Sequence, residues 1–312
     1  MYLKLYRQLE QSIPDFNRLL QRFPSRHYKV YKIPKRTFGF RTIAQPTPAV
    51  KIIQKKIIAL LSNDVDIHSS ATAYVEGKSI KDNALHHAKS EFILKVDLEN
   101  FFNSITPKIL FKALKKQNIS LSNQDIHVLE QFLFWNISKK VNGKLVLSVG
   151  APSSPFVSNV VMFSFDKRMS KICSKNNILY TRYADDLTFS TKKKGVLFNH
   201  LNEIRNLLKK EFGAKLTLNE SKTVFTSKAH NRHVTGVTIT NNNKLSLGRD
   251  KKRYISALIH KFKHGHLSEE DIHHLKGLIS HALHIENKFI SNMSKKYSEE
   301  TLIAIKKYPS GV

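Results

Sequence analysis

The stretch Tyr183-Ala184-Asp185-Asp186 decides the fold, because it sets two adjacent acidic residues between two apolar segments. Residues 178–183 before it and residues 187–190 after it each have the composition of a short β-strand. Two strands joined by so short a connection form a tight hairpin, and at its turn both carboxylates can lean toward one site. The sequence therefore predicts a hairpin that presents Asp185 and Asp186 together.

A third acidic residue, Asp97, closes a predicted apolar strand at residues 92–98, where a charge would otherwise be out of place. Phosphoryl transfer from a nucleotide spreads negative charge over phosphate oxygens, and carboxylates can hold two Mg²⁺ ions about 3.5–4 Å apart to neutralise it. We therefore expect Asp97, Asp185 and Asp186 to be catalytic and to bind two Mg²⁺ ions. The alternative is that Asp185-Asp186 is an ordinary turn and Asp97 an acid that begins a helix.

The charge of the chain indicates its partner. Its 312 residues include 52 Lys and Arg against 24 Asp and Glu, a net charge of +28, and 41% are hydrophobic, enough for a sizeable core. Such a surplus attracts polyanions, either nucleic acid or an anionic membrane. No apolar run reaches the roughly 18–20 residues of a spanning helix, and the first ten residues lack signal-peptide features. We expect nucleic acid as partner, no membrane and, with Cys173 as the single cysteine, a cytoplasmic location.

Apolar periodicity and turn residues predict an α+β fold. Strands are expected at residues 28–43 (a basic hairpin), 92–98, 145–147, 178–183, 187–190, 234–239 and 244–247, and helices within 1–25 and at 49–61, 107–114, 120–134, 154–169, 198–212 and from 249 onward. The basic residues run from end to end of the chain, which favours a charged channel within the fold over a basic tail.

Seven short motifs, in order along residues 28–240, resemble those of reverse transcriptases. They are Ile33-Pro34-Lys35-Arg36 through Arg41, Asn83-Ala84-Leu85-His86-His87, Val96-Asp97-Leu98-Glu99-Asn100-Phe101-Phe102, Gly150-Ala151-Pro152-Ser153-Ser154-Pro155, Tyr183-Ala184-Asp185-Asp186, Asn219-Glu220-Ser221-Lys222-Thr223 and Val234-Thr235-Gly236. The second and the last are similar to the Asn-Ala-x-x-His and Val-Thr-Gly elements of bacterial retron enzymes. The chain is identified on this basis as resembling retron reverse transcriptases.

The resemblance implies a right-hand polymerase fold. Residues 1–91 would form N-terminal helices and fingers, residues 92–240 the palm with a finger insertion at about 107–145, and residues 241–312 a mainly helical, RNA-binding thumb. It also implies that the backbone of Leu98 joins the three aspartates as a metal ligand.

For the nucleotide, the resemblance implies that Phe102 is a steric gate against a ribose 2′-OH and that Gly150 and Ala151 lie beneath the nucleotide. Lys35 and Arg41 would contact the triphosphate, and Lys222 would donate a proton to pyrophosphate. Each has a plainer alternative: Phe102 in the core, a fingers hairpin that grips template or faces solvent, and a surface lysine. Val149 departs from the family, which commonly has Gln there, and this puts fidelity and nucleotide affinity in doubt.

For RNA, the resemblance implies binding roles for Asn83, His87, Val234, Thr235 and Gly236. The residues themselves favour RNA contact at the start of a C-terminal helix, where Arg249, Lys251, Lys252 and Arg253 precede aromatic residues, although such a charge run is also common on solvated surfaces. The seven histidines between positions 260 and 284 lack the spacing and the cysteines of a zinc site, so we expect none there.

The implied function is RNA-directed DNA polymerisation that copies a structured non-coding RNA into small single-stranded DNA. Synthesis would be primed from an RNA 2′-OH, would consume dNTPs and would give branched RNA–DNA (msDNA), in anti-phage defence with an accessory effector protein. The alternatives are another bacterial reverse transcriptase, of the abortive-infection or diversity-generating type, and a non-catalytic RNA-binding module. The retron-like elements argue against the first alternative, and the complete set of acids argues against the second.

Overall fold

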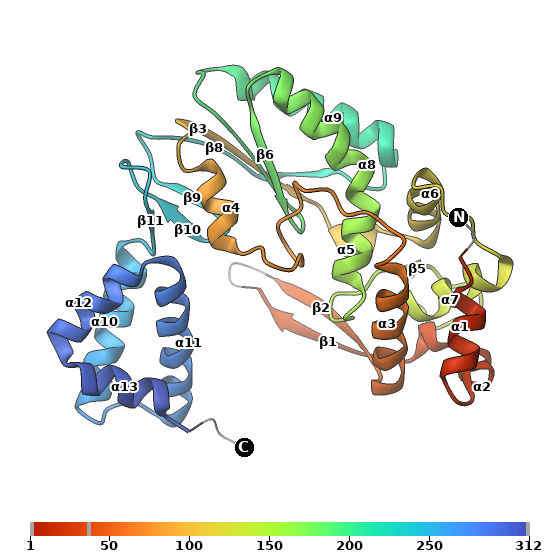
Figure 1. Ribbon diagram of the computed structural model, residues 1–312, viewed down its shortest axis with the longest axis horizontal. Coiled ribbons are helices and arrows are strands. Elements are labelled where there is room, and N and C mark those ends of the chain that lie inside the picture. Colours follow the sequence, from red (N-terminus) through yellow and green to blue (C-terminus); the bar gives the residue numbers. More distant parts are fainter. Residues whose placement is uncertain (1–2, 36–38, 310–312) are drawn as a thin grey trace. The chain divides into compact units, whose positions relative to one another are not determined.

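The computed structural model describes residues 3–35 and 39–309 (Figure 1). The chain divides into two compact units, Met1–Gly77 with Leu94–Val224, and Lys78–Ile93 with Phe225–Val312. The boundary falls inside two strands, β3 (Phe92–Leu98) and β8 (Leu218–Ser227). Each unit is built from segments distant in sequence, so its core depends on long-range contacts.

The first unit combines helices with three small groups of strands. Its elements are α1 (Leu5–Ser12), α2 (Phe16–Gln21), η1 (Pro24–Arg26), β1 (Tyr28–Pro34), β2 (Phe40–Pro46), α3 (Pro48–Leu61), α5 (Phe101–Ser104), α6 (Pro107–Lys116), α7 (Asn123–Leu133), β4 (Trp135–Asn136), β5 (Leu145–Val146), α8 (Ser154–Lys175), β6 (Leu179–Tyr183), β7 (Asp186–Thr191) and α9 (Val196–Phe212).

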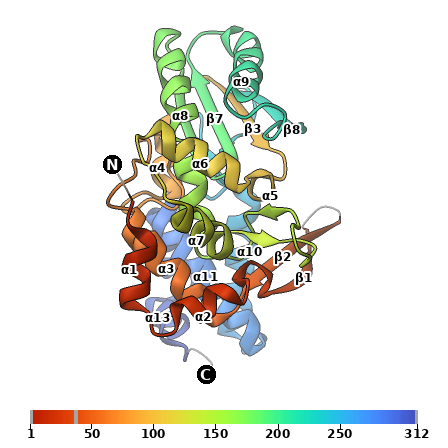
Figure 2. The ribbon, with the colours of Figure 1, turned by 90° about the vertical axis from the view of Figure 1, so that its right-hand side faces the viewer.

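Four strands, in the order β6-β7-β3-β8, form the sheet that carries the acidic residues. The middle strands are the most apolar: Leu94 and Val96 of β3 and Leu187 and Phe189 of β7 are buried. Helix α8 packs against β6 and α9 against β7, while α6 lies along α8 (Figure 2). A sheet backed by helices in this way holds the ends of β3, β6 and β7 in fixed positions.

The second unit contains α4 (Ile80–His87), a three-stranded sheet and four C-terminal helices. Its other elements are β9 (Arg232–Val234), β10 (Val237–Ile239), β11 (Leu245–Ser246), α10 (Arg249–Lys263), α11 (Glu269–Ile285), α12 (Asn287–Tyr297) and α13 (Glu299–Lys307). Its core brings apolar side chains of α4 and the sheet together with those of the C-terminal helices, among them Ala84, Val234, Ile255 and Ile279. The C-terminal region is therefore helical, as its sequence predicts.

Most of the expected elements are present, and the differences have local causes. The strand predicted at residues 234–239 is broken, because Thr235 and Gly236 adopt left-handed backbone angles (φ +47° and +78°) and form a turn between β9 and β10. Helix α7 begins later than predicted because Ser122 and Asp125 form a capping box. Helix α4 and strand β8 were not predicted as elements.

Among the residues described, no helix is long and apolar enough to cross a membrane. Each compact unit combines segments that are distant in sequence, whereas the predicted fingers, palm and thumb follow one another along the chain. The two compact units therefore do not test the predicted domain boundaries at residues 91 and 240 or the finger insertion at 107–145, which stay a prediction.

Candidate active site

The turn between β6 and β7 brings the three predicted aspartates to one place. The predicted tight hairpin is present: Tyr183 pairs with Asp186, so Asp186 begins β7 and Ala184 and Asp185 make a two-residue turn. Ala184 has φ +56°, a left-handed conformation that is costly for a residue with a Cβ. The Leu98 N–H donates to the Asp185 carbonyl at 3.0 Å, which sets Asp97 at the end of β3 beside the turn.

The three carboxylates repel one another at a site where Asp97 is buried, Asp185 is half-buried and Asp186 reaches the surface. Burial raises the pKa of Asp185, and the charge of Asp97 adds to this effect. The pKa of Asp186 rises further, to about 6, because of burial and then the charges of Asp185 and Asp97. Cations would relieve this repulsion, since an opposite charge favours the ionised form.

Two lysines, Lys222 and Lys95, lie close enough to the three carboxylates to offset part of their negative charge. The Lys222 ammonium donates to both carboxylate oxygens of Asp97, at 3.1 and 2.9 Å. Burial lowers the pKa of Lys95, while the charge of Asp186 acts in the opposite direction. Lys95 was missed in the sequence, although alternation along β3 puts it on the same face as Asp97.

The donor set fits hard divalent cations, because carboxylate oxygens are the ligands that such ions prefer. The ammonium of Lys222 occupies Asp97 as a cation would. Within the part of the chain that the structure describes, no three His, Cys, Asp or Glu side chains are gathered into a group ready to hold a metal ion. The aspartates would therefore have to adjust on metal binding, with Lys222 releasing Asp97.

A buried ion pair supports the turn between β6 and β7 through a hydrogen bond to the Ala184 carbonyl. Arg182 of β6 and Asp166 of α8 are both completely buried, and Arg182 Nη2 lies 2.7 Å from Asp166 Oδ2. Arg182 Nη1 also donates to the Ala184 carbonyl at 3.1 Å, and the Tyr180 hydroxyl donates to Asp166 at 2.7 Å. The sequence analysis did not predict this ion pair. It could have been suspected because Arg182 interrupts an apolar strand and Asp166 interrupts the apolar face of a helix.

Three of the residues predicted to bind the nucleotide line one cavity of about 390 Å³. Phe102, Gly150 and Ala151 line it together with Tyr74 and Lys51. Phe102 is half-buried and borders this space, whereas its neighbour Phe101 is 3% exposed and belongs to the core. Lys51, Lys55 and Tyr74 were not predicted; the spacing of the two lysines on one helix face was the available signal.

The floor of this cavity is fixed by a close backbone approach. Gly150 has φ +119°, and a Cβ there would lie 3.0 Å from a methyl carbon of Ile43 and 3.3 Å from the Ala44 carbonyl oxygen. The Ala44 N–H donates to the Val149 carbonyl at 2.9 Å. The backbone of Val149 thus joins the floor to β2 whatever side chain it carries.

Lys35 and Arg41 are both exposed on the β1–β2 hairpin, where Arg41 pairs with Ile33. The charge of Arg41 lowers the pKa of Asp185, against the larger effect of burial. It thereby contributes to the electrostatics of the carboxylate cluster. Residues 36–38, which include Arg36 and part of the turn expected at residues 37–39 of this hairpin, lie outside the described residues.

The two retron-like elements meet inside the second unit. Asn83 Nδ2 lies 3.4 Å from Thr235 Oγ1, and the Thr235 hydroxyl lies 3.4 Å from the Ile80 carbonyl. Asn83, His87 and Val234 are at most 1% exposed, so their side chains are not available to RNA and the prediction of direct contact needs correction. Thr235 and Gly236 are more accessible, at the surface of the turn. The buried residues hold α4 to that turn.

The predicted basic residues of α10 differ from one another. Lys252 donates to Glu286 at 2.6 Å, and Lys251 lies 3.5 Å from His281 Nε2. Arg249 and Arg253 are exposed. The two arginines are therefore the more accessible cations for a polyanion.

Comparison with known proteins agrees with this geometry. The family model described as "Reverse transcriptase (RNA-dependent DNA polymerase)" matches residues 33–239. The chain is 56% identical over 311 residues, covering both sequences completely, to "Retron Ec83 reverse transcriptase" of Escherichia coli. It is 30% identical over 279 residues to "Retron Mx162 reverse transcriptase" of Myxococcus xanthus, covering 81% of this chain and 56% of that one.

A solved structure supports the fold. Apo telomerase from Candida tropicalis superposes with a TM-score of 0.52 at 14% identity, covering 90% of this chain and 61% of that one. The predicted α+β, right-hand polymerase fold is confirmed. The family generally uses divalent metal ions, as the donor set here requires. This chain belongs to the reverse transcriptases and, within them, to the bacterial retron enzymes, and it is an RNA-directed DNA polymerase.

Proposed function

We propose that this enzyme copies its own structured non-coding RNA into a small single-stranded DNA. Synthesis starts from a 2′-OH of that RNA, so that the product is a branched RNA–DNA molecule, msDNA. The observation that carries the proposal is the 56% identity, over the whole chain, to a retron reverse transcriptase. The meeting of the two retron-like elements at Asn83 and Thr235 supports it independently.

In this proposal Asp97, Asp185 and Asp186, with the backbone carbonyl of Leu98, hold two Mg²⁺ ions. When bound, the ions supply charge neutralisation at the phosphate oxygens and lower the pKa of the attacking hydroxyl. The protein's own part is to hold the carboxylates close despite their repulsion. The hydrogen bond from Leu98 to Asp185 and the contact of Arg182 with Ala184 support this role.

The incoming dNTP lies in the cavity lined by Phe102, Gly150 and Ala151. The ring of Phe102 takes up the space of a ribose 2′-OH, and Lys35 and Arg41 bind the triphosphate. Lys222 would serve as proton donor to pyrophosphate. The contact of Lys222 with Asp97 supports this assignment, because its ammonium group lies beside one of the carboxylates that would hold the metal ions.

The RNA is held by its shape and backbone, in a mainly helical thumb. The accessible turn at Thr235 and Gly236, and Arg249, Lys251, Lys252 and Arg253 of α10, contact it, while Asn83, His87 and Val234 position that turn. The partners are the cognate non-coding RNA, its msDNA product, dNTPs and an accessory effector protein. The setting is anti-phage defence in the cytoplasm.

The test is to express the chain with its native upstream sequence in a bacterium. Total nucleic acid is then run on a denaturing gel, with and without RNase and debranching enzyme. A discrete small DNA that shifts in mobility on debranching is the expected result.

If no such DNA forms while the purified protein still extends a DNA primer on an RNA template, the branched product is wrong and the polymerase assignment stands. A matched control carries Asp185→Ala and Asp186→Ala with the same upstream sequence and should give no DNA.

A further inference from the structure

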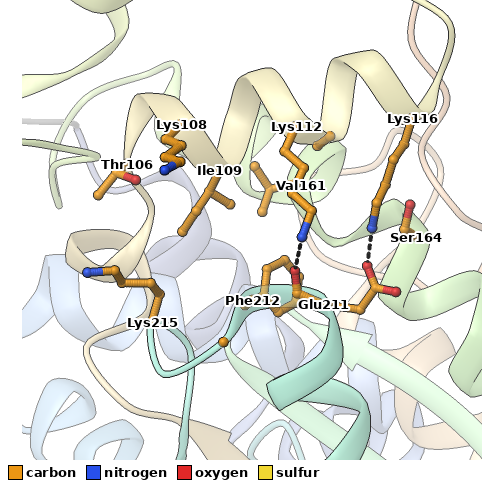
Figure 3. Close-up of a pocket in the computed structure, with 12 residues that line it drawn as sticks. Thr106, Lys108, Ile109, Lys112, Lys116, Val161, Ser164, Glu211, Phe212 and Lys215 are labelled. Carbon is orange, nitrogen blue, oxygen red and sulfur yellow. Dashed lines mark hydrogen bonds and ion pairs between the residues drawn. The ribbon is translucent and has the colours of Figure 1, made fainter.

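A second pocket in the first unit lies outside the candidate active site. It has a volume of about 290 Å³ and lies between α6, α8 and the end of α9 (Figure 3). Four lysines line it, Lys108, Lys112, Lys116 and Lys215, against one acid, Glu211. None of its residues belongs to the seven motifs, so the polymerase site does not explain it.

Two of the four lysines hold the pocket together. Lys112 donates to the Glu211 carbonyl at 2.9 Å, close to the carboxyl end of α9, where a cation is favourable. Lys116 pairs with the Glu211 carboxylate, which also lies 3.1 Å from Arg168. The one acid in the pocket is therefore neutralised by its own neighbours, as the dashed contacts in Figure 3 show in part.

The other two lysines, Lys108 and Lys215, do not contribute to these contacts. Within the residues that the structure describes, the ammonium groups of Lys108 and Lys215 have no hydrogen-bond or ion-pair partner. In Figure 3 they lie with Thr106 at the end of the pocket away from Lys116. Thr106 is the N-cap of α6, yet its hydroxyl caps no backbone N–H. Two unengaged cations and a hydroxyl at one end of a pocket suit a phosphate group.

Apart from Ser164, the remaining wall is mainly apolar. Ile109 and the ring of Phe212 are both half-buried, so they present a surface on which a base can pack, with the buried Val161 behind them. Aromatic contact beside cationic side chains is how proteins bind single-stranded nucleic acid without reading its sequence. The combination fits a nucleotide better than a free inorganic anion, which would leave the apolar wall unused.

Further exposed lysines lie on the same helices. They are Lys115 of α6, Lys167 and Lys171 of α8, and Lys209 and Lys210 of α9. A nucleic-acid strand carries a phosphate at every nucleotide, so these helices offer it additional cations outside the pocket.

We propose that this pocket binds one nucleotide of a single-stranded nucleic acid. Lys108, Lys215 and the Thr106 hydroxyl hold its phosphate, and Ile109 and Phe212 pack against its base. The enzyme thereby holds a strand at a point separate from its carboxylates. The inference rests on the chain being an RNA-directed DNA polymerase and not on the proposed branched product.

The test uses the full chain carrying Lys108→Glu and Lys215→Glu. The matched control is Lys192→Glu with Lys194→Glu, the same change of charge at two exposed lysines in the loop after β7. Binding of fluorescent oligo(rU) and oligo(dT) strands is measured by anisotropy over a range of salt. An excess of unlabelled primer–template keeps the polymerase site filled.

The pocket variant should bind the strands about tenfold or more weakly, with a salt slope lower by about 1.4, since each lost contact to a single strand contributes about 0.7. The control should stay close to wild type, and both variants should extend a short primer. A preference for rU would assign the site to RNA, and one for dT to the DNA product. Equal loss in the two variants, or displacement of all labelled strand by primer–template in the wild type, would overturn the proposal.

A second measurement does not depend on variants. Strands carrying 5-iodouracil are cross-linked to the wild-type chain, and the modified peptides are mapped by mass spectrometry. Cross-links within residues 106–116 or 209–215 are expected under the same competition. Cross-links confined to other segments would contradict the site.

Discussion

The Lys222 ammonium lies 2.9 and 3.1 Å from the two carboxylate oxygens of Asp97, so it neutralises an acid that we propose as a metal ligand. Lys222 is itself largely exposed, which leaves it free to move away. If Asp97 holds metal as proposed, the Lys222 ammonium and the metal ion compete for the same carboxylate. The proposal then requires Lys222 to leave Asp97 before metal can bind there.

Replacing Lys222 by Met should separate these two effects. Half-maximal activity should occur at a lower metal concentration, because no ammonium competes for Asp97. The turnover rate should fall by about 10²-fold or more, because a proton donor is lost. Metal titrations of primer extension measure both quantities. Lys222→Arg keeps the competing charge and should keep the wild-type metal requirement; if both variants shift it equally, competition is not the cause.

Phe102 should decide which sugar enters the cavity. Phe102→Ala opens the space of the 2′-OH, so the preference for dNTP over rNTP, as a ratio of kcat/KM, should fall by on the order of 10²-fold. Single-nucleotide incorporation measures this ratio. Phe101→Leu is the control, because Phe101 is a core residue and its loss should lower stability without changing the ratio. An unchanged ratio in Phe102→Ala would remove the gate role.

The ion pair between Arg182 and Asp166 should matter for the shape of the turn as well as for stability. Asp166→Asn alone should lower the free energy of unfolding by roughly 3–5 kcal/mol, because it leaves a buried guanidinium without its counter-charge. Urea denaturation measures this loss.

The double variant Arg182→Met with Asp166→Leu removes both charges and should recover most of that stability. Primer extension should stay low, because the Ala184 carbonyl has lost its donor and the left-handed turn its support. Full activity in the double variant would show that the pair acts only on stability.

His87 should make the second unit sensitive to acid. Burial lowers its pKa to about 3, against about 6.5 in an unfolded chain. Its contribution to stability is therefore complete above pH 6.5 and is lost as the pH falls toward 3, by up to about 1.4 kcal/mol per pH unit. Unfolding of His87→Gln, followed from pH 7.5 to 4.5, should depend less on pH than that of the wild type. The control His230→Gln changes an exposed histidine and should keep the wild-type slope; an equally flat slope there would contradict the assignment.

Local pattern in the sequence predicted most of the helices and strands, and it predicted that the three aspartates lie near one another. Residues 183–186 specify a hairpin because the two predicted strands leave only residues 184–186 between them, and the structure shortens this connection to a two-residue turn. Asp97 could be placed with them because it ends an apolar strand, and Phe102 could be separated from Phe101 by its motif position. These features depend on neighbours in sequence, so they can be read without the fold.

Tertiary contacts could not be predicted in this way. Asn83 looks like a polar helix residue, and only the fold places it against Thr235, 152 positions away. Lys112 lies on α6 and Lys215 in the loop after α9, and their separation in the sequence gives no sign that they line one pocket. Thr235 in a left-handed conformation broke a predicted strand, because a β-branched residue rarely adopts that conformation without surrounding support.

The most direct test of the active site is the double variant Asp185→Ala with Asp186→Ala, compared with Glu269→Ala and Glu270→Ala, two adjacent exposed acids on α11. DNA synthesis on an RNA template and RNA binding are measured for both proteins. Synthesis should disappear in the aspartate variant while RNA binding persists, and the glutamate variant should behave as wild type. DNA synthesis that survives the loss of both aspartates would contradict the assignment of the catalytic carboxylates.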